Sequence, residues 1–455
     1  MSTSEGLFGA VQRFFADLPN TLVDLFDQLR HIQITPLRVV LAGLIFWLCL
    51  VRALRWRRYY AIHSKYGPKW DNGRGTLSPQ EAQSISHVTM NYDMPLLMNY
   101  SLAFALFKTY GIPSISKLLL ATKQLSTKAF VSRRYTDTEL LIATFFTCPL
   151  SGFVDPSFAE QNRAKGPDAQ PAEDPRAMIA VARMNWLHSR HNISNGDYLY
   201  TLSLFILEPI AWAKRFGWRP LSPMEQDGYF RYWVDIGAKM KIQDIPETLE
   251  ALEDFAERYE ATYMVPAQSN HETAIHTLDE LLSAVPDALG LKSFGQRISI
   301  CLMSERVRVA MMFPEQPWIC HFITKSSLGL VAGFQHYFML PRWSPRTLVH
   351  YDIKTHFEPG TCPRLHSKKW PARPWYRAEA TGLGYLRDKF LVAMGWFTEM
   401  PSPNLKSGGY RIEELGPIHL ENKGHEEVFR EAAELQGCPI AGPWSPEARH
   451  HVQNA

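Results

Sequence analysis

The 455-residue chain has 46% hydrophobic and 12% aromatic residues and a formal net charge of +3. Lys and Arg are scattered among Asp and Glu without a long basic block, so the composition does not indicate a nucleic-acid partner. The six cysteines form no C-x-x-C pair, which argues against a zinc site or a disulfide framework and favours a reducing compartment. Such an apolar composition suits a chain that contacts a bilayer or holds a large apolar ligand.

The first strong signal along the chain is the uncharged run VVLAGLIFWLCLV, residues 39 to 51. The run alone is short for a membrane span of about 20 residues, but Arg38 and Arg52 at its ends can snorkel to the interfaces. We therefore expect one transmembrane helix over residues 35 to 55. A buried core helix or a displaced signal peptide would carry a similar run, but no small-residue cleavage site follows and no second such run is present.

Cations around this run predict its orientation. Basic residues follow the span, whereas residues 1 to 34 mix basic with acidic side chains. The positive-inside rule then places the C-terminal part of a single-pass protein in the cytosol and residues 1 to 34 in the lumen. These first residues carry apolar side chains at helical spacing, so we expect them to lie along the membrane surface or to pack against a partner helix.

Residues 56 to 340 are predicted to form a helical catalytic domain. Two capping-box sequences, starting at Ser78 and Ser222, predict helix starts, and residues 248 to 263 and 276 to 289 have 3.6-residue apolar spacing. Strand-like alternation is scarce, so the fold class is expected to be all-α. Breaks are expected at residues 110 to 113, at residues 217 to 220, and in the polar stretch 157 to 175, which is predicted to be an exposed loop.

The last segment, residues 341 to 455, is rich in Pro, Gly and cations and is predicted to be a loop-rich C-terminal extension. No linker is sharp enough to make it an independent domain. We expect it to wrap the core or to lie against lipid headgroups. The predicted organisation is therefore a lumenal segment (1 to 34), a transmembrane helix (35 to 55), a helical domain (56 to 340) and this extension.

One candidate for chemistry is VSRRYTDTELL, residues 131 to 141. Thr136 or Asp137 is interpreted first as the N-cap of the apolar helix that follows. A functional interpretation stays open, because residues 94 to 136 contain no Asp or Glu and leave Arg133 and Arg134 without a nearby acidic partner. These cations could meet anionic propionates or help to bind an oxygen-derived ligand.

A second candidate is RMNWLHSRH, residues 183 to 191, which sets His188 and His191 three residues apart on nearly one helical face. The H-E-x-x-H pattern of zinc proteases is absent, and no acidic residue lies three positions before either histidine, as a helical di-iron site requires. One helix presenting His to a large apolar pocket is how globin-like proteins hold haem iron. The alternative is a hydrogen-bonded core histidine at 188 and a surface histidine at 191, and periodicity does not decide between these interpretations.

Several separated blocks together carry a family resemblance: FALFKTYGIPSISKLL, SRRYTDTELL, RMNWLHSRH, NGDYLYTLSLFILEP and GWRPLSP. In this order they resemble the fungal ER-bound oxygenases of the mycophenolic acid biosynthesis type. That family is distantly similar to the rubber oxygenases, or latex clearing proteins. The similarity covers about residues 85 to 340 and the N-terminal anchor, which is more specific than any single motif.

The resemblance implies a globin-like helical core that holds haem b. Rubber oxygenases bind iron through a His downstream of an R-x-x-K-T stretch, which here is similar to residues 134 to 138. By this match His188 is the expected iron ligand and His191 the second choice. Arg133, Arg134 and Arg183 are expected to contact the cofactor, and Arg134, Asp137 and Thr138 to act in catalysis, with Asp137 managing protons.

Two departures from the family pattern affect the distal side. Asp137 replaces the lysine of the R-x-x-K-T stretch, so a residue that could occupy the sixth haem position is missing. The acid-free run from 94 to 136 also leaves no counterpart of the carboxylate that rubber oxygenases use upstream of the Arg. Acid or base assistance is then expected from Asp137, Glu139 or elsewhere.

The resemblance further implies a dioxygen-dependent oxygenase of the endoplasmic reticulum membrane. The expected reaction is oxidative cleavage of a C=C bond in the prenyl (farnesyl) chain of an aromatic meroterpenoid. A bilayer would concentrate such a substrate near an anchored active site. Two alternatives are an oxygenase with non-haem iron shared by His188 and His191, and a non-catalytic, membrane-tethered haem- or lipid-binding protein. The sequence does not predict the oligomeric state.

Overall fold

The computed structural model describes residues 35 to 445 except 74, 124 to 127, 155 to 172, 284, 286 to 289, 351 to 363 and 369 to 372. Within these residues the regular secondary structure is helical, apart from two isolated β-bridges. The predicted all-α class is therefore confirmed. The predicted amphipathic segment 1 to 34 and most of the predicted loop 157 to 175 lie outside the described residues.

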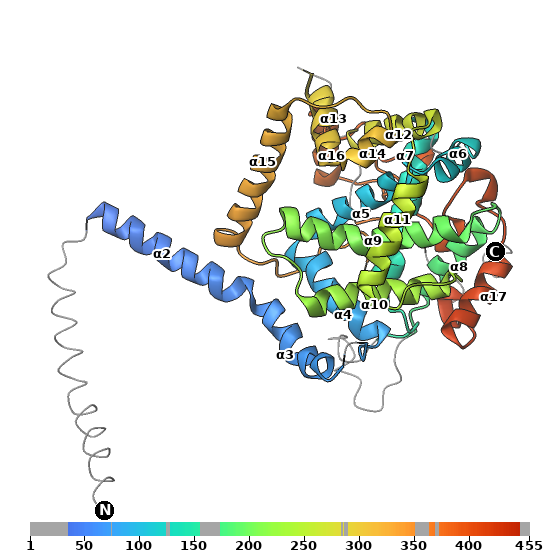
Figure 1. Ribbon diagram of the computed structural model, residues 1–455, viewed down its shortest axis with the longest axis horizontal. Helices are drawn as coiled ribbons and strands as arrows, with labels where there is room; N and C mark the ends of the chain where they lie inside the picture. Colours follow the sequence, from blue (N-terminus) through green and yellow to red (C-terminus); the bar gives the residue numbers. More distant parts are fainter. Residues whose placement is uncertain are drawn as a thin grey trace, which may run out of the picture. The chain divides into compact units, whose positions relative to one another are not determined.

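Figure 1 shows the helices in their spatial arrangement. The described α-helices are α2 (Pro36–Arg55), α3 (Arg57–Asp71), α4 (Pro79–His87), α5 (Pro95–Thr109), α6 (Pro113–Ala121), α7 (Lys128–Thr147), α8 (Arg176–His188), α9 (Asn195–Phe216), α10 (Pro223–Lys239), α11 (Leu249–Tyr263), α12 (Gln268–Leu281), α13 (Leu291–Leu302), α14 (Glu305–Ala310), α15 (Trp318–Tyr337), α16 (Leu383–Ala393) and α17 (His425–Gln436). The segment η1 (Val88–Asp93) is π-helical, and the 3-10 helices are η4 (Pro403–Leu405), η5 (Ile412–Glu414), η6 (Ile418–Leu420) and η7 (Gly442–Trp444).

The described residues form two compact units, of which the smaller comprises the chain up to Trp56 together with Tyr337–Leu340. Its helix α2 coincides with the predicted span of residues 35 to 55 and buries only Val51 and Arg55. Pro36 at its first position and the Thr35 hydroxyl, which accepts a bond from the amide of Arg38, explain where it begins. Among the described residues, only the stretch that begins with α2 is long and apolar enough to cross a membrane.

The larger unit contains Arg57–His336 and the described residues from Pro341 onward. Its main packing pairs are α5 with α9, α4 with α10, α7 with α8 and α8 with α17. Burial of apolar side chains along these pairs supplies the driving force for the fold. Because α7, α8 and α9 carry the motifs singled out in the sequence, this packing brings those motifs around one interior space.

Both predicted capping boxes are confirmed, at Ser78 of α4 and at Ser222 of α10. The second has a further role, because its Glu225 also accepts hydrogen bonds from the buried guanidinium of Arg219 at 2.6 and 2.7 Å. Arg219 additionally binds Asp93 at 2.8 Å, at the end of η1. This buried ion cluster ties the start of α10 to the π-helical segment, an element type that often occurs at functional sites.

Other predicted boundaries differ from the structure. The helix expected over residues 276 to 289 begins earlier, at Gln268, and ends at Leu281. The first half of this helix is mostly polar, so its sequence lacks the 3.6-residue apolar spacing that would have indicated the start. The extension from residue 341 contains α16 and α17 besides its loops. The proposed domain boundaries stay a prediction, although the described part of this extension contacts α7 and α8, as detailed below.

Candidate functional site

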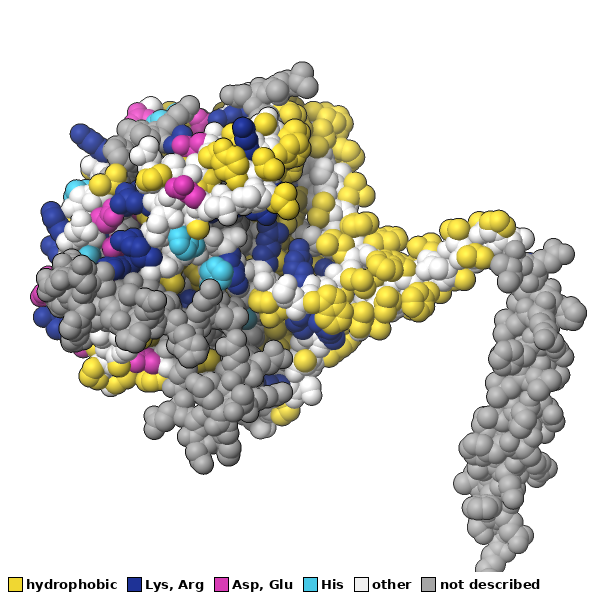
Figure 2. All heavy atoms as spheres, turned by 180° about the vertical axis from the view of Figure 1, so that it is seen from behind, with side chains coloured by type: hydrophobic (Ala, Val, Ile, Leu, Met, Phe, Trp, Pro, Cys, Tyr) yellow, Lys and Arg dark blue, Asp and Glu magenta, His cyan; other side chains and the backbone are white. Residues whose placement is uncertain are grey.

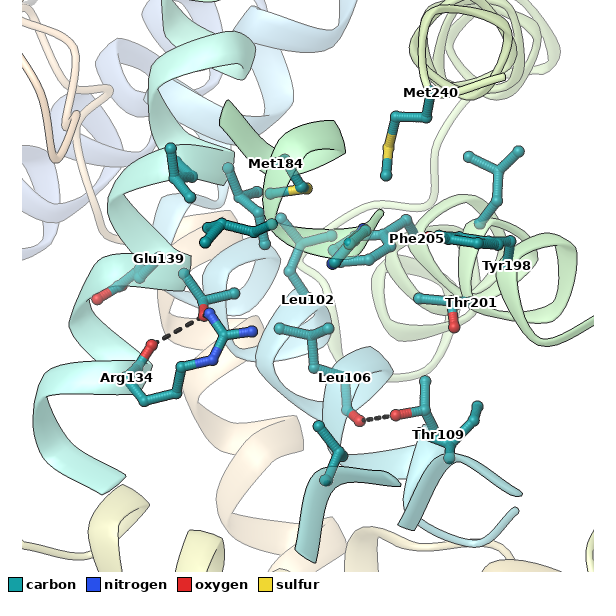
Figure 3. A pocket seen from close by; sticks show the side chains of 18 of the residues that line it. Leu102, Leu106, Thr109, Arg134, Glu139, Met184, Tyr198, Thr201, Phe205 and Met240 are labelled. Carbon is teal, nitrogen blue, oxygen red and sulfur yellow. Dashed lines mark hydrogen bonds between the residues drawn. The ribbon is translucent and has the colours of Figure 1, made fainter. Parts of the chain in front are cut away.

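A cavity of about 1230 Å³ lies within the larger unit, among α5, α6, α7, α8 and α9. Its wall is mostly apolar, as Figure 3 illustrates with Leu102, Leu106, Met184, Phe205 and Met240. Ligand pockets usually measure about 300 to 1,000 Å³. The cavity is therefore roomy enough for a large cofactor together with part of an apolar substrate.

His188 is the last residue of α8 and lines this cavity. Its Nδ1 atom is shielded from solvent and has no hydrogen-bond partner among the described residues. Burial, with smaller contributions from Arg134 and His191, lowers the pKa of His188 to about 4. The imidazole is therefore neutral at physiological pH, which is the form that binds metals.

His191 also lines the cavity, but it does not lie on the same helix. The helix α8 ends at His188, and the exposed His191 follows in a turn where its amide donates to the His188 carbonyl at 2.9 Å. The interpretation of two imidazoles on one helical face is therefore wrong. The residues Ser189 and Arg190 between them are exposed and form the turn.

Arg134 extends from α7 toward Leu102 and Leu106 of α5, as Figure 3 shows. Its Nη1 donates to the Thr138 hydroxyl, one turn further along α7, and Thr138 in turn donates to the Arg134 carbonyl at 2.8 Å. No described residue forms an ion pair with Arg134, and burial lowers its pKa. A guanidinium in this position favours an anionic group in the cavity.

Arg133 and Asp137 point elsewhere. Asp137 does not line the cavity; it accepts a hydrogen bond from the Tyr376 hydroxyl at 2.7 Å and another from the Gly416 amide at 3.2 Å. Burial raises the pKa of Asp137 to about 6, against the opposing effect of Arg133. Arg133 forms an ion pair with Glu421 at 2.8 Å. These residues therefore attach the C-terminal extension to α7, which is not the placement expected for residues that contact a cofactor or reacting atoms.

The predicted N-cap at Thr136 or Asp137 is also wrong. Helix α7 begins at Lys128 and continues through both residues, and the Thr136 hydroxyl donates to the Ser132 carbonyl at 3.0 Å within the helix. The short polar side chains suggested a helix start because the same residue types cap helices. Here their partners are a preceding carbonyl and the C-terminal extension.

Arg183 is buried on α8 and directs its guanidinium to three carbonyls of the extension. The acceptors are the carbonyl oxygens of Leu415 at 2.9 Å, Lys423 at 2.8 Å and Leu420 at 2.9 Å. Since Arg183 does not line the cavity, its expected contact with a cofactor is not supported by its position. Its geometry instead holds η5, η6 and the loop before α17 against α8.

Three polar residues of the cavity wall were missed by the sequence analysis. Asn91 of η1, Trp233 of α10 and Thr347 of the C-terminal extension line the cavity, and each has a shielded side-chain nitrogen or hydroxyl without a described partner. A π-helical segment has no sequence signal comparable to the 3.6-residue period, and Thr347 lies in a region interpreted only as extension. The amide of Arg346 donates to the Asn91 carbonyl at 2.8 Å, which places Thr347 beside η1.

The cavity wall thus combines the neutral imidazole of His188, the guanidinium of Arg134, which forms no ion pair with a described residue, and other polar groups in mostly apolar surroundings. Among the described residues, no three His, Cys, Asp or Glu side chains are grouped as metal ligands. A prosthetic group that needs a single protein imidazole and carries its own anionic groups matches this arrangement. Glu139 is a carboxylate on the cavity wall, as the sequence analysis allowed.

The chain is similar to a group of oxygenases. Residues 176–323 match the family described as ER-bound oxygenase mpaB/B'/rubber oxygenase, catalytic domain. The chain is 29% identical to ER-bound oxygenase mpaB' of Penicillium brevicompactum, over 92% of this chain and 97% of the relative. It is 30% identical to ER-bound oxygenase mpaB of Penicillium roqueforti (strain FM164), over 60% and 89%, and 31% identical to mpaB of Penicillium brevicompactum, over 79% and 82%.

Removal of one hydroxyl tests the attachment of the extension to α7. We expect Tyr376→Phe to lower the free energy of unfolding by about 1 to 3 kcal/mol, because it removes the donor to Oδ1 of the buried Asp137 carboxylate and leaves only the Gly416 amide bond to Oδ2. The control Tyr385→Phe removes a hydroxyl from a 47% exposed side chain of α16 and is expected to change stability by less than about 0.5 kcal/mol. Urea denaturation in detergent measures the free energy of unfolding of both variants. An equal loss of stability in the two would contradict the attachment of the extension through Tyr376.

The pKa of His188 predicts a pH dependence of stability in the ligand-free protein. The unfolded chain binds this proton near the ordinary pKa of about 6.5 and the folded chain near 4, so acid favours the unfolded state between these values. Wild type should therefore lose stability relative to His188→Gln by about 1.4 kcal/mol per pH unit as the pH falls from 6.5 toward 4. Denaturation midpoints at several pH values measure the difference, and a pH-independent difference is the contradicting result.

Proposed function

Since the chain belongs to the ER-bound oxygenase mpaB/B'/rubber oxygenase family and is an oxygenase, we propose that it uses haem b and dioxygen. The proposed reaction is cleavage of a C=C bond in the farnesyl chain of an aromatic meroterpenoid. One observation carries the proposal: the shielded, neutral imidazole of His188 on an apolar cavity of about 1230 Å³. The sequence alternative of a non-catalytic binding protein is not supported, because the relatives are oxygenases.

The residues present fit a haem group. His188 would bind the iron, because it lines the cavity as a neutral imidazole and its Nδ1 has no described hydrogen-bond partner. Arg134 would meet a propionate, which would supply the counter-ion that no described side chain provides. When bound, haem supplies the iron at which dioxygen is activated. His191 remains the second choice as ligand, because it also lines the cavity.

The chain's own residues would orient the substrate and exclude water. Apolar residues of α5 and α9, including Leu102, Leu106 and Phe205, would pack against a prenyl chain. Asn91 and Trp233 have donors without described partners and would bind oxygen atoms of the aromatic part of the substrate. Thr138 would keep the Arg134 guanidinium in place through its hydroxyl.

Cleavage of a C=C bond by dioxygen balances without a further reductant. The double bond and the O–O bond break, and each former alkene carbon becomes a carbonyl carbon with one oxygen atom. Any proton transfer during this reaction would fall to Glu139, which lines the cavity, rather than to Asp137, which does not. Asp137 would act as a positioning residue through Tyr376 and the extension.

The proposed location is the endoplasmic reticulum membrane, after which the relatives are named. The helix α2 would be the single span, with the N-terminus in the lumen and the catalytic unit in the cytosol, because cations follow the span. A farnesylated aromatic partitions into lipid, so an active site tethered at the membrane would receive it from the bilayer. The partner is thus a prenylated small molecule as well as the bilayer itself.

A second candidate is an oxygenase with non-haem iron shared by His188 and His191. The position of both imidazoles on the same cavity favours it. It differs from the haem proposal in an observable way, since it predicts bound iron without a Soret band.

Absorption spectra and pyridine haemochrome assays of detergent-purified protein test the proposal. Wild type and His191→Ala are expected to show a Soret band and bound haem b, while His188→Ala should retain at least about tenfold less haem. Arg134→Gln should weaken haem retention without abolishing it, because it removes the positive charge proposed to pair with a propionate and leaves His188 in place. The matched control His419→Ala changes an exposed histidine of the same cavity wall and should keep full haem.

Wild type should also consume dioxygen when a farnesylated aromatic is added. Wild type that contains iron but no haem, despite haem supply during expression, would support the non-haem candidate and contradict the proposal. Equal haem content in His188→Ala and wild type would contradict His188 as the ligand.

A further inference from the structure

Helix α15 (Trp318–Tyr337) presents an unusually apolar surface. Of its 20 residues only Cys320 and Thr324 are buried. The large apolar side chains exposed on it are Trp318, Ile319, Phe322, Ile323, Leu330, Val331, Phe334 and Tyr337. A contiguous apolar surface of this kind marks an interaction site on a protein.

The composition of α15 matches a helix that lies at a membrane interface. It contains no Asp or Glu, and Lys325 is its one Lys or Arg. Its first and last residues, Trp318 and Tyr337, are exposed aromatic residues of the types that concentrate at membrane interfaces. Figure 2 shows the yellow apolar side chains that cover this part of the surface.

The chain that leaves α15 provides the second observation. Tyr337–Leu340 belong to the same compact unit as α2. Trp47 of α2 donates from Nε1 to the Phe338 carbonyl at 2.9 Å, and Arg55 donates from Nη1 to the Met339 carbonyl at 3.0 Å. Trp47 precedes Arg55 by eight residues, about 12 Å along the helix. Phe338 therefore contacts the apolar part of α2, well before its cationic end.

We propose that α15 is a second membrane-contacting element of this chain, an interfacial helix whose exposed apolar face inserts into the bilayer. The proposal rests on the membrane-spanning role of α2 in the proposed function, but it does not depend on haem. Lipid is favoured over a second copy of the chain, because the segment that follows α15 already lies on the apolar part of α2. A protein partner there would itself have to enter the hydrocarbon region.

The segment that follows α15 would then connect the membrane-inserted helix to the wall of the cavity. Arg346, Thr347 and Leu348 line the cavity and lie nine to eleven residues after Tyr337. Between them, the carbonyls of Arg342 and Trp343 accept hydrogen bonds from the guanidinium of Arg58 at 2.6 and 3.1 Å. A membrane-inserted α15 would thus hold one wall of the cavity close to the source of an apolar substrate.

Photocrosslinking of the full-length protein in phosphatidylcholine and phosphatidylserine vesicles tests the proposal. A photoreactive benzophenone amino acid is placed in turn at Leu330 and Phe334, which are 75% and 58% exposed on α15. The matched control position is Ile418 of η6, which is 55% exposed. The η6 segment is attached to α8 through the bond from Arg183 to the Leu420 carbonyl, and α8 lies across the larger unit from α15 in Figure 1.

We expect Leu330 and Phe334 to label a clickable phospholipid at least about fivefold more than Ile418. Lipid labelling equal to that at Ile418 would overturn the proposal, as would crosslinks that join two copies of the chain in place of lipid. Circular dichroism shows that each variant is folded. Lipid labelling does not require a bound cofactor. Protein that contains no haem but still labels lipid would therefore contradict the haem proposal and leave the proposal for α15 intact.

As a second measurement, Leu330→Ser/Phe334→Ser is combined with the photoreactive residue at Phe322. Loss of apolar contact should reduce lipid labelling from Phe322 by at least about threefold, while α2 still anchors the protein. Unchanged labelling in this variant would also overturn the insertion of the α15 face.

Discussion

A polar group buried in apolar surroundings is unfavourable unless it finds a partner, and this constraint organises the site. His188 avoids the penalty of charge by remaining neutral, since burial lowers its pKa to about 4. Arg134 donates to the Thr138 hydroxyl and lines the cavity, and it forms no ion pair with a described residue. The fold thus retains two groups whose natural partners are a metal and an anion. The proposed haem, with iron at its centre and propionates at its edge, would provide both partners.

The C-terminal extension is attached to both helices that carry His188 and Arg134. Arg183 of α8 donates hydrogen bonds to carbonyls of the extension. Asp137 of α7 accepts hydrogen bonds from Tyr376 and Gly416, so the extension is bonded to both helices. Arg134, which precedes Asp137 by three residues on α7, lines the cavity, whereas Arg133 and Asp137 do not. Adjacent helical positions differ by about 100° in direction. That rotation explains why Arg133 pairs with Glu421 of the extension while the adjacent Arg134 lines the cavity.

The sequence was sufficient for the all-α class, the helix starts at Ser78 and Ser222 and the apolar helix α2, because capping chemistry and hydropathy are local properties. His188 was identified as a candidate and lies on the cavity wall. The burial of Asp137 against Tyr376 could not be predicted, since it depends on a contact between residues far apart in sequence. The end of α8 before His191 was missed because its turn is formed by Ser189, Arg190 and His191, which include no Gly or Pro to indicate a break. Asn91 was missed because a π-helical turn has no periodic signature.

The most direct test replaces His188 by Gly and supplies the missing imidazole from solution. The account predicts that detergent-purified His188→Gly binds little haem and that added imidazole restores haem binding and its Soret band, whereas the same treatment leaves His191→Gly unchanged. Haem uptake by His188→Gly that is complete without imidazole would contradict the central claim, namely that the imidazole of His188, whose Nδ1 has no described partner, is the iron ligand in this cavity.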